Sequence, residues 1–190
     1  MPSADLQDIE REAVKLVRHL EKLDPPIRVS ELLAKQWPKI HVGDADLGDY
    51  HGALVTDGGR AAMYVSQKAN EDQKNIILAH LTWHWIKHAL KGQIDITRQC
   101  LVHVPRPEDP LSATERDADM FASELLVPLQ ALEKHIDFAS EQKTDEDRAY
   151  VSRRTTELAA LFAVPAEVMK ARLTLFAARR RSFRPRAPRG

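Results

Sequence analysis

The sequence contains very little cysteine, since Cys100 is the single one among 190 residues. One cysteine cannot form a disulfide within the chain, which excludes a small secreted domain held together by disulfides. The first fifteen residues, MPSADLQDIEREAVK, also lack the apolar core of a secretory signal. These two absences lead us to expect a cytoplasmic protein.

Long hydrophobic runs are missing as well. A membrane-spanning helix needs roughly 18 apolar residues, and the most apolar window, Ile76 to Ala89, contains three histidines and a lysine. We therefore expect no membrane span. The composition, 43% hydrophobic and 29% charged, is typical of a globular protein.

The chain carries no net charge, with 28 basic and 28 acidic residues, but the basic residues are unevenly distributed. Six arginines fall in residues 179–190, which contain no acid, so the remainder carries 22 basic and 28 acidic groups. The sequence predicts a disordered basic tail over 179–190. A tail of this kind can bind nucleic acid, but we favour the interpretation that it is a solvated terminus.

Hydrophobic periodicity predicts one α+β domain over residues 1–178. It consists of N-terminal helices within 5–36, a sheet and further helices within 39–138, and a C-terminal helical pair within 152–176. Short apolar runs at 40–42, 52–56 and 61–65 predict a small antiparallel sheet of about three strands, with a hairpin turn at Asp57-Gly58-Gly59. Residues 71–90 have a helical period, and 93–112 are expected to be irregular.

Two histidines on the predicted helix over 71–90 have the spacing of metal ligands. His80 and His84 are four residues apart, so they project from the same face of the helix. Such a pair suits a tetrahedral zinc ion, but the HxxxH spacing alone is weak evidence because it often arises by chance. Two partly buried histidines without a metal are the alternative.

The next helix offers carboxylates that strengthen the case for zinc. Glu115 is a candidate third ligand, and Asp119 lies one turn further along the same face. Zinc sites of this type use two histidines and a glutamate, with a neighbouring carboxylate on the second nitrogen of a histidine. The alternative is that Glu115 and Asp119 are solvated acids on an amphipathic helix.

Three stretches together resemble the ImmA/IrrE family of zinc metallopeptidases: GALVTDGGRAAMYVSQKANEDQKNIILAHLTWHWIKH, TERDADMFASELLVP and ELAALFAVPAEVMKARL. In that family a β-hairpin leads into a helix with H-E-x-x-H, and a second helix carries E-x-x-A-N-x-F-A-x-x-L-L-x-P. The second signature is the more specific. It is matched at Glu115, Ala118, Phe121, Ala122, Leu125, Leu126 and Pro128.

The resemblance implies a minimal zincin-like (gluzincin) fold and a site for zinc. It assigns His80, His84 and Glu115 as the metal ligands, and it places Asp119 where the family usually has asparagine. It also places Leu81 where the family has the glutamate that acts as general base. A leucine cannot transfer a proton, and general acid–base catalysis is typically worth about 10²–10⁴-fold.

A second departure from the family pattern is Trp83, which precedes His84 where glycine is usual. The indole can fill part of a substrate groove, or it can pack in the core, which is the commoner fate of a tryptophan on a helix.

The resemblance implies a bacterial or phage regulator that acts on a repressor of the helix-turn-helix type. With Leu81 in place of the base, we expect a pseudoenzyme that recognises this protein partner with absent or weak proteolysis. One alternative is an active zinc endopeptidase in which Glu124 or Asp117 supplies the base. Another is a DNA-binding regulator that uses residues 166–175 as a recognition helix, together with the arginine tail, although that helix offers only Lys170 and Arg172 as basic residues.

Overall fold

A computed structural model describes residues 6–57, 60–90, 98–103, 113–136 and 154–182. The elements follow in the order α1 (Leu6–Val17), α2 (Val29–Gln36), β1 (Ile40–Ala45), β2 (Gly52–Asp57), β3 (Arg60–Ser66), α3 (Glu71–His84), the π-helix η1 (Trp85–Leu90), β4 (Arg98–His103), α4 (Ala113–Leu126), α5 (Leu129–Lys134), a helix over 154–162, and α7 (Ala166–Ser182). The α+β class predicted from the sequence is confirmed. Among the described residues, no helix is both long and apolar enough to cross a membrane.

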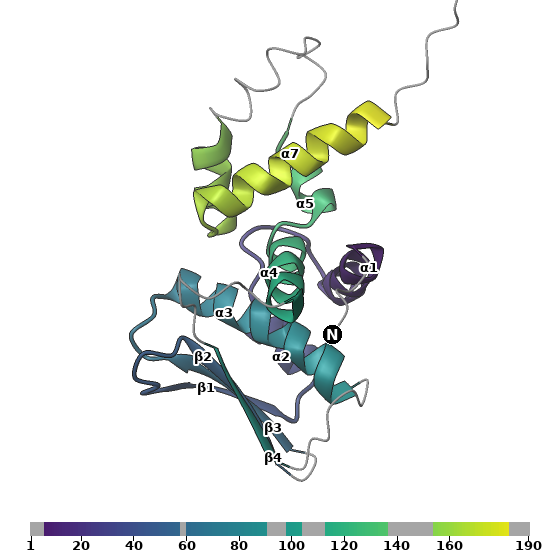
Figure 1. Cartoon of the computed structure of the whole chain (residues 1–190). Coiled ribbons are helices and arrows are strands. Elements are labelled where there is room, and N and C mark those ends of the chain that lie inside the picture. Colours follow the sequence, from purple (N-terminus) through teal and green to yellow (C-terminus); the bar gives the residue numbers. More distant parts are fainter. Residues whose placement is uncertain (1–5, 58–59, 91–97, 104–112, 137–153, 183–190) are drawn as a thin grey trace, which may run out of the picture.

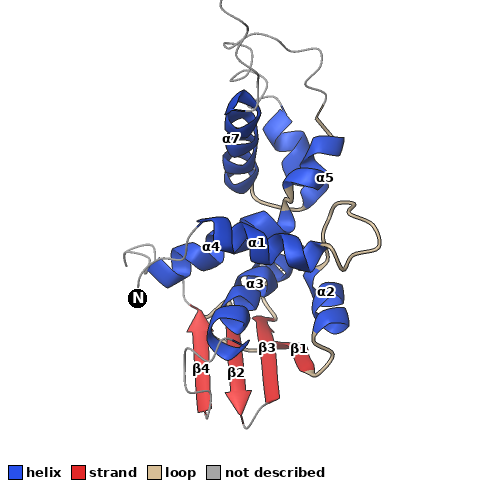
Figure 2. Ribbon diagram, turned by 90° about the vertical axis from the view of Figure 1, so that its right-hand side faces the viewer, coloured by secondary structure: helices blue, strands red, loops and turns tan. Residues whose placement is uncertain are grey.

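The sheet has four strands in the order β1-β3-β2-β4 (Figure 2). The predicted hairpin forms, with β2 and β3 antiparallel and Asp57 paired with Arg60. The prediction of a wholly antiparallel sheet is wrong, however, because β1 pairs in parallel with β3. Residues 46–51 connect the end of β1 to the start of β2, which runs in the opposite direction, and β3 then returns between the two strands, parallel to β1.

The fourth strand is a second correction. Residues 93–112 were expected to be irregular because of Pro105, Pro107 and Pro110, but 98–103 form β4 antiparallel to β2. The three prolines all follow this strand. The stretch 104–112 lies outside the described residues.

The elements are arranged in layers, with α3 lying between the sheet and α4 (Figure 1). Ala61, Met63 and Val65 of β3 are buried at alternate positions, as expected for a strand with one face against a helix. The core continues upward through α3 and α4 to Leu158, Phe162 and Leu173 of the C-terminal helices. In both views α5 and α7 lie on the far side of α4 from the sheet.

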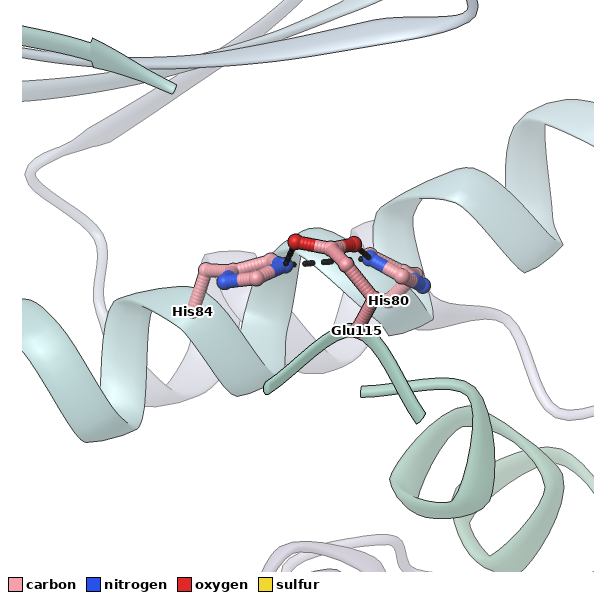
Figure 3. A group of neighbouring side chains, drawn as sticks. All are labelled: His80, His84 and Glu115. Atoms are coloured by element: carbon pink, nitrogen blue, oxygen red, sulfur yellow. Dashed lines mark hydrogen bonds and ion pairs between the residues drawn. The ribbon is translucent and has the colours of Figure 1, made fainter. Parts of the chain in front are cut away.

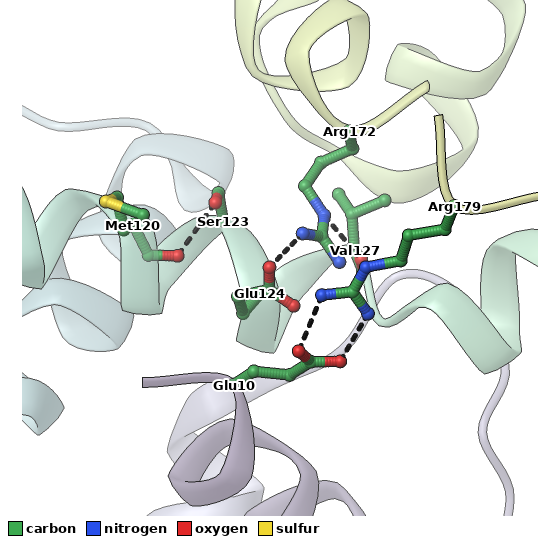
Figure 4. Close-up of polar contacts among 7 residues, drawn as sticks. All are labelled: Glu10, Met120, Ser123, Glu124, Val127, Arg172 and Arg179. Carbon is green, nitrogen blue, oxygen red and sulfur yellow. Dashed lines mark hydrogen bonds and ion pairs between the residues drawn. The ribbon is translucent and has the colours of Figure 1, made fainter. Parts of the chain in front are cut away.

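Two arginines of α7 attach the C-terminal helices to the rest of the domain (Figure 4). Arg172, 2% exposed, donates from Nε to the carbonyl of Val127 at 3.0 Å and pairs through Nη1 with Glu124 of α4. Arg179 makes two hydrogen bonds, of 2.5 and 2.6 Å, with the carboxylate of Glu10 on α1. The predicted start of the tail at Arg179 therefore falls inside α7, while residues 183–190 lie outside the described residues.

Candidate metal centre

The helix that carries both histidines has a well-defined start. Asn70 caps α3 by accepting a hydrogen bond from the backbone N–H of Gln73 at 2.9 Å, and the side chain of Gln73 accepts one from the Asn70 N–H at 3.0 Å. The helix then passes into the core, and every residue from Leu78 to His84 is buried. The cap and this packing together fix the rotation of α3, and with it the direction of His80 and His84.

His80, His84 and Glu115 converge, as predicted (Figure 3). The two Nε2 atoms are 3.0 Å apart, and the Glu115 carboxylate faces both. Its Oε2 is 3.2 Å from His80 Nε2, and its Oε1 is 3.5 Å from His84 Nε2. Both imidazoles are almost fully buried, whereas the Glu115 side chain remains 29% exposed.

The spacing of these atoms fits one small ion. Two ligand atoms of a tetrahedral zinc ion lie about 3.3 Å apart, given zinc–ligand bonds of about 2.0–2.1 Å. The two Nε2 atoms, at 3.0 Å, are close to that value; the two carboxylate distances, 3.2 and 3.5 Å, involve different oxygens of Glu115, and one ligand atom from each residue lies within 4.8 Å of the other two. Two imidazole nitrogens and one carboxylate oxygen are also a ligand set that zinc accepts, and they leave a fourth position for a water or substrate oxygen. The three residues thus form a candidate metal site, and their role as ligands stays a prediction.

Asp119 lies next to this group, one turn along α4 from Glu115. Its Oδ1 is 2.8 Å from Nδ1 of His80, so it accepts a hydrogen bond from the imidazole nitrogen that faces away from the cluster. Burial acts to lower the pKa of His80, but the hydrogen bonds with Asp119 and Glu115 outweigh it, and the pKa of the metal-free imidazole is raised. A metal ion and a proton would therefore compete for His80.

Leu81 follows His80 by one residue, about 100° around the helix, and its side chain lies toward the sheet. It is fully buried and belongs to the hydrophobic core. A Cβ atom added to Gly52, the first residue of β2, would lie 3.2 Å from Leu81 Cδ1 and 2.5 Å from Ile77 Cγ2. The family's general-base position is therefore an apolar contact between α3 and β2. Sequence reasoning missed the part played by Gly52, because only the tertiary packing shows it.

Trp83 packs in the core. It is 1% exposed, and its ring lies 5.1 Å from that of Phe121 on α4. The ammonium of Lys87 lies over the indole, 5.2 Å from the ring centre. Of the two interpretations of this tryptophan, the structure favours the core.

The two alternative bases lie away from the cluster. Glu124 forms an ion pair with Arg172 at the other end of α4. Asp117 is buried, but it lies two residues from Glu115 and therefore about 200° around the helix axis from it. Neither carboxylate faces the histidines from its position on α4.

An α+β domain in which one helix presents HxxxH and the next presents a glutamate has the plan of a metallopeptidase domain with a single metal site. The family model of the IrrE N-terminal-like domain, peptidase family M78, matches residues 36–174. The chain therefore belongs to the ImmA/IrrE family, as the resemblance predicted, and membership implies the zincin-like fold. A comparison with curated proteins gave no match.

Proposed function

We propose that this chain is a zinc-binding ImmA/IrrE protein that recognises a repressor-type protein partner and cleaves it weakly or not at all. The observation that carries the proposal is the packing of Leu81. His80, His84 and Glu115 converge as candidate ligands. At the position where the family has its general base, however, Leu81 is buried between α3 and β2.

His80, His84 and Glu115 would hold the ion, and Asp119 would orient His80 through Nδ1. Zinc would polarise a carbonyl and lower the pKa of a water molecule at such a site. None of these four residues is available as the base, since three of them would bind the metal and Asp119 accepts a hydrogen bond from Nδ1 of His80. With Leu81 in the place of the family's glutamate, none of the described residues named above would take up the proton that peptide hydrolysis releases from water.

The partner is inferred from the family, whose resemblance implies a regulator that acts on a helix-turn-helix repressor. The rival proposal of a DNA-binding regulator is weakened by Arg172, one of the two basic residues of the would-be recognition helix. It is 2% exposed and bound to Glu124 and Val127 within the domain. A side chain in that position cannot reach a phosphate or a base without leaving its pocket.

Metal content and cleavage test the proposal together. The unmodified protein should purify with about one equivalent of zinc, and His80→Ala should not. Zinc-loaded unmodified protein should cleave neither labelled casein nor a helix-turn-helix repressor encoded beside it at an appreciable rate, whereas Leu81→Glu should raise the rate by about 10²-fold or more.

Leu81→Gln is the matched control, because the amide has the same size as the glutamate side chain but cannot accept the proton. It should remain as inactive as the unmodified protein. Both variants bury a polar group in the core, so circular dichroism must show that they fold. Efficient proteolysis by the unmodified protein, abolished by His80→Ala, would overturn the proposal.

A further inference from the structure

A pocket of about 490 Å³ opens beside the first turns of α3. We refer to it as the α3 pocket, and its lining comes from three segments: the loop before β2, the turn after β3, and α3 itself. The lining residues are Gly48, Asp49, Tyr50, His51, Ser66, Lys68, Ala69, Gln73, Ile76 and Ile77. Its volume is within the range of about 300–1,000 Å³ that is typical of ligand sites.

Hydrogen bonds hold the walls of the α3 pocket in place. The ammonium of Lys68 donates to the carbonyl of Gly48 at 3.0 Å, which ties the turn after β3 to the loop before β2. The backbone N–H of Ser66 donates to the carbonyl of His51 at 2.8 Å. Gly48 has a φ of 62°, which favours glycine at this bend. The pocket is therefore already formed in the unbound chain.

The α3 pocket lies along the same side of α3 as the candidate metal ligands. Ile76 precedes His80 by four residues and Ile77 precedes His84 by seven, spacings that place side chains on one face of a helix. The distance along the axis from Ile76 to His80 is about 6 Å. An extended peptide covers that distance with about two residues.

Asp49 and His51 also line the pocket, but its apolar residues, which lie on α3 and just before it, favour a bulky uncharged side chain. Ala69, Ile76 and Ile77 are partly buried apolar residues that pack against the core. The charge of Lys68 is already directed at Gly48, and the side-chain oxygen of Gln73 at the backbone of Asn70. Tyr50 stands at the rim, 43% exposed, where an incoming side chain can cover its ring.

We propose that the α3 pocket binds a leucine- or phenylalanine-like side chain of the partner segment that lies across the metal centre. The inference rests on the proposed function for the nature of the partner. It adds a specificity-determining site, with Tyr50 as wall and Ile76 and Ile77 as floor, which selects a large apolar residue about two positions from the one that faces the metal.

Two capped amino acids, N-acetyl-leucine amide and N-acetyl-glycine amide, test the pocket by nuclear magnetic resonance on the full-length, nitrogen-15-labelled chain. The leucine compound should shift the amide signals of residues 48–51, 66–69 and 73–77 saturably and bind at least about tenfold more tightly than the glycine compound. Tyr50→Ala should weaken leucine binding several-fold. Tyr64→Ala is the matched control, because Tyr64 lies outside the pocket and packs on His41.

Equal affinity for the two compounds, shifts confined to other residues, or no effect of Tyr50→Ala would overturn the inference. The proximity to the metal centre is tested with Co²⁺ as a paramagnetic substitute for zinc, which should broaden the signals of the bound leucine compound. Unbroadened signals with cobalt demonstrably bound would overturn the inference too. Leucine binding to a chain that takes up no metal would instead contradict the proposed metal site and leave the pocket in place.

Discussion

At the scale of single residues, the strength of His80 as a metal ligand depends on Asp119. Its carboxylate accepts the hydrogen bond from Nδ1 of His80, and a charged acceptor makes the imidazole a stronger metal ligand than a neutral amide does. We predict that Asp119→Asn lowers zinc affinity about tenfold while the zinc stoichiometry stays unchanged. A competition titration against a chromophoric chelator measures this.

A matched control for Asp119→Asn is Asp72→Asn, which makes the same change at an exposed position in the first turn of α3. It should leave the affinity unchanged. An equal loss in both variants would point to a general effect of charge rather than to the contact with His80.

Trp83 illustrates why a departure from the family pattern at one residue cannot simply be reversed. The indole packs against Phe121 of α4 and is one of the largest fully buried side chains, so glycine at this position would leave a large gap in the core. We predict that Trp83→Gly lowers the free energy of unfolding by about 3–5 kcal/mol, with a further contribution of about 1 kcal/mol from glycine inside a helix.

Urea denaturation of the metal-free protein measures the effect of Trp83→Gly, and Trp83→Phe, which retains a ring, should cost much less. A glycine variant as stable as the parent would mean that the ring does not support the helix pair. For the same reason, Leu81→Glu alone is a better test of restored catalysis than a double variant with Trp83→Gly.

At the scale of elements, the close contact between α3 and β2 depends on Gly52, which has no side chain. A methyl group at position 52 would lie 2.5 Å from Cγ2 of Ile77, an atom attached directly to a branched carbon with little freedom to move. We predict that Gly52→Ala destabilises the fold by about 1–3 kcal/mol. A double-mutant cycle with Ile77→Ala should recover part of this loss, because the smaller side chain makes room. Strictly additive losses would place the strain elsewhere.

The elements that could be predicted from the sequence are those with local causes. The α3 helix and the β2–β3 hairpin follow from periodicity and from turn residues a few positions apart, and the ligand cluster follows from the HxxxH spacing and the Glu115 signature. The parallel partner of β1 and the pairing of β4 with β2 depend on contacts between distant segments, which periodicity does not encode. The end of α7 at Ser182 was missed for the same reason, since Arg179 pairs with Glu10 on the first helix.

At the scale of the whole molecule, the candidate site lies between two helices, α3 and α4, and each of them packs against a further part of the domain. α3 carries the histidines and packs on the sheet through Leu81, while α4 carries Glu115 and Asp119 and is bound by α7 through Glu124 and Arg172. The ligand set therefore brings together helices that are supported from opposite sides (Figure 1). A metal ion that bridges α3 and α4 should stabilise the whole domain rather than one helix.

The attachment of α7 leads to a prediction about the C-terminus. A chain that ends after Ser182 should melt within about a degree of the full chain, because the deleted sequence FRPRAPRG has few residues to bury. A chain that ends after Ala178 loses the last turn of α7 and the paired hydrogen bonds between Arg179 and Glu10. We expect this to cost about 1 kcal/mol, or about 2–4 °C in the melting temperature.

The pH dependence separates the ion pair from simple helix packing. The hydrogen bonds with Arg179 lower the pKa of Glu10 in the folded chain. The pair therefore stabilises the fold fully above the pKa of glutamate in the unfolded chain. This stabilisation is lost as the pH falls through the lower pKa of Glu10 in the folded chain. The difference in melting temperature between the two truncated chains should therefore be full at pH 7 and shrink below about pH 4. In the chain that ends after Ser182, Glu10→Gln should reproduce most of the loss at pH 7 and little of it in acid. A difference that persists unchanged in acid would assign the stabilisation to the packing of the last turn of α7 instead of to Glu10 and Arg179.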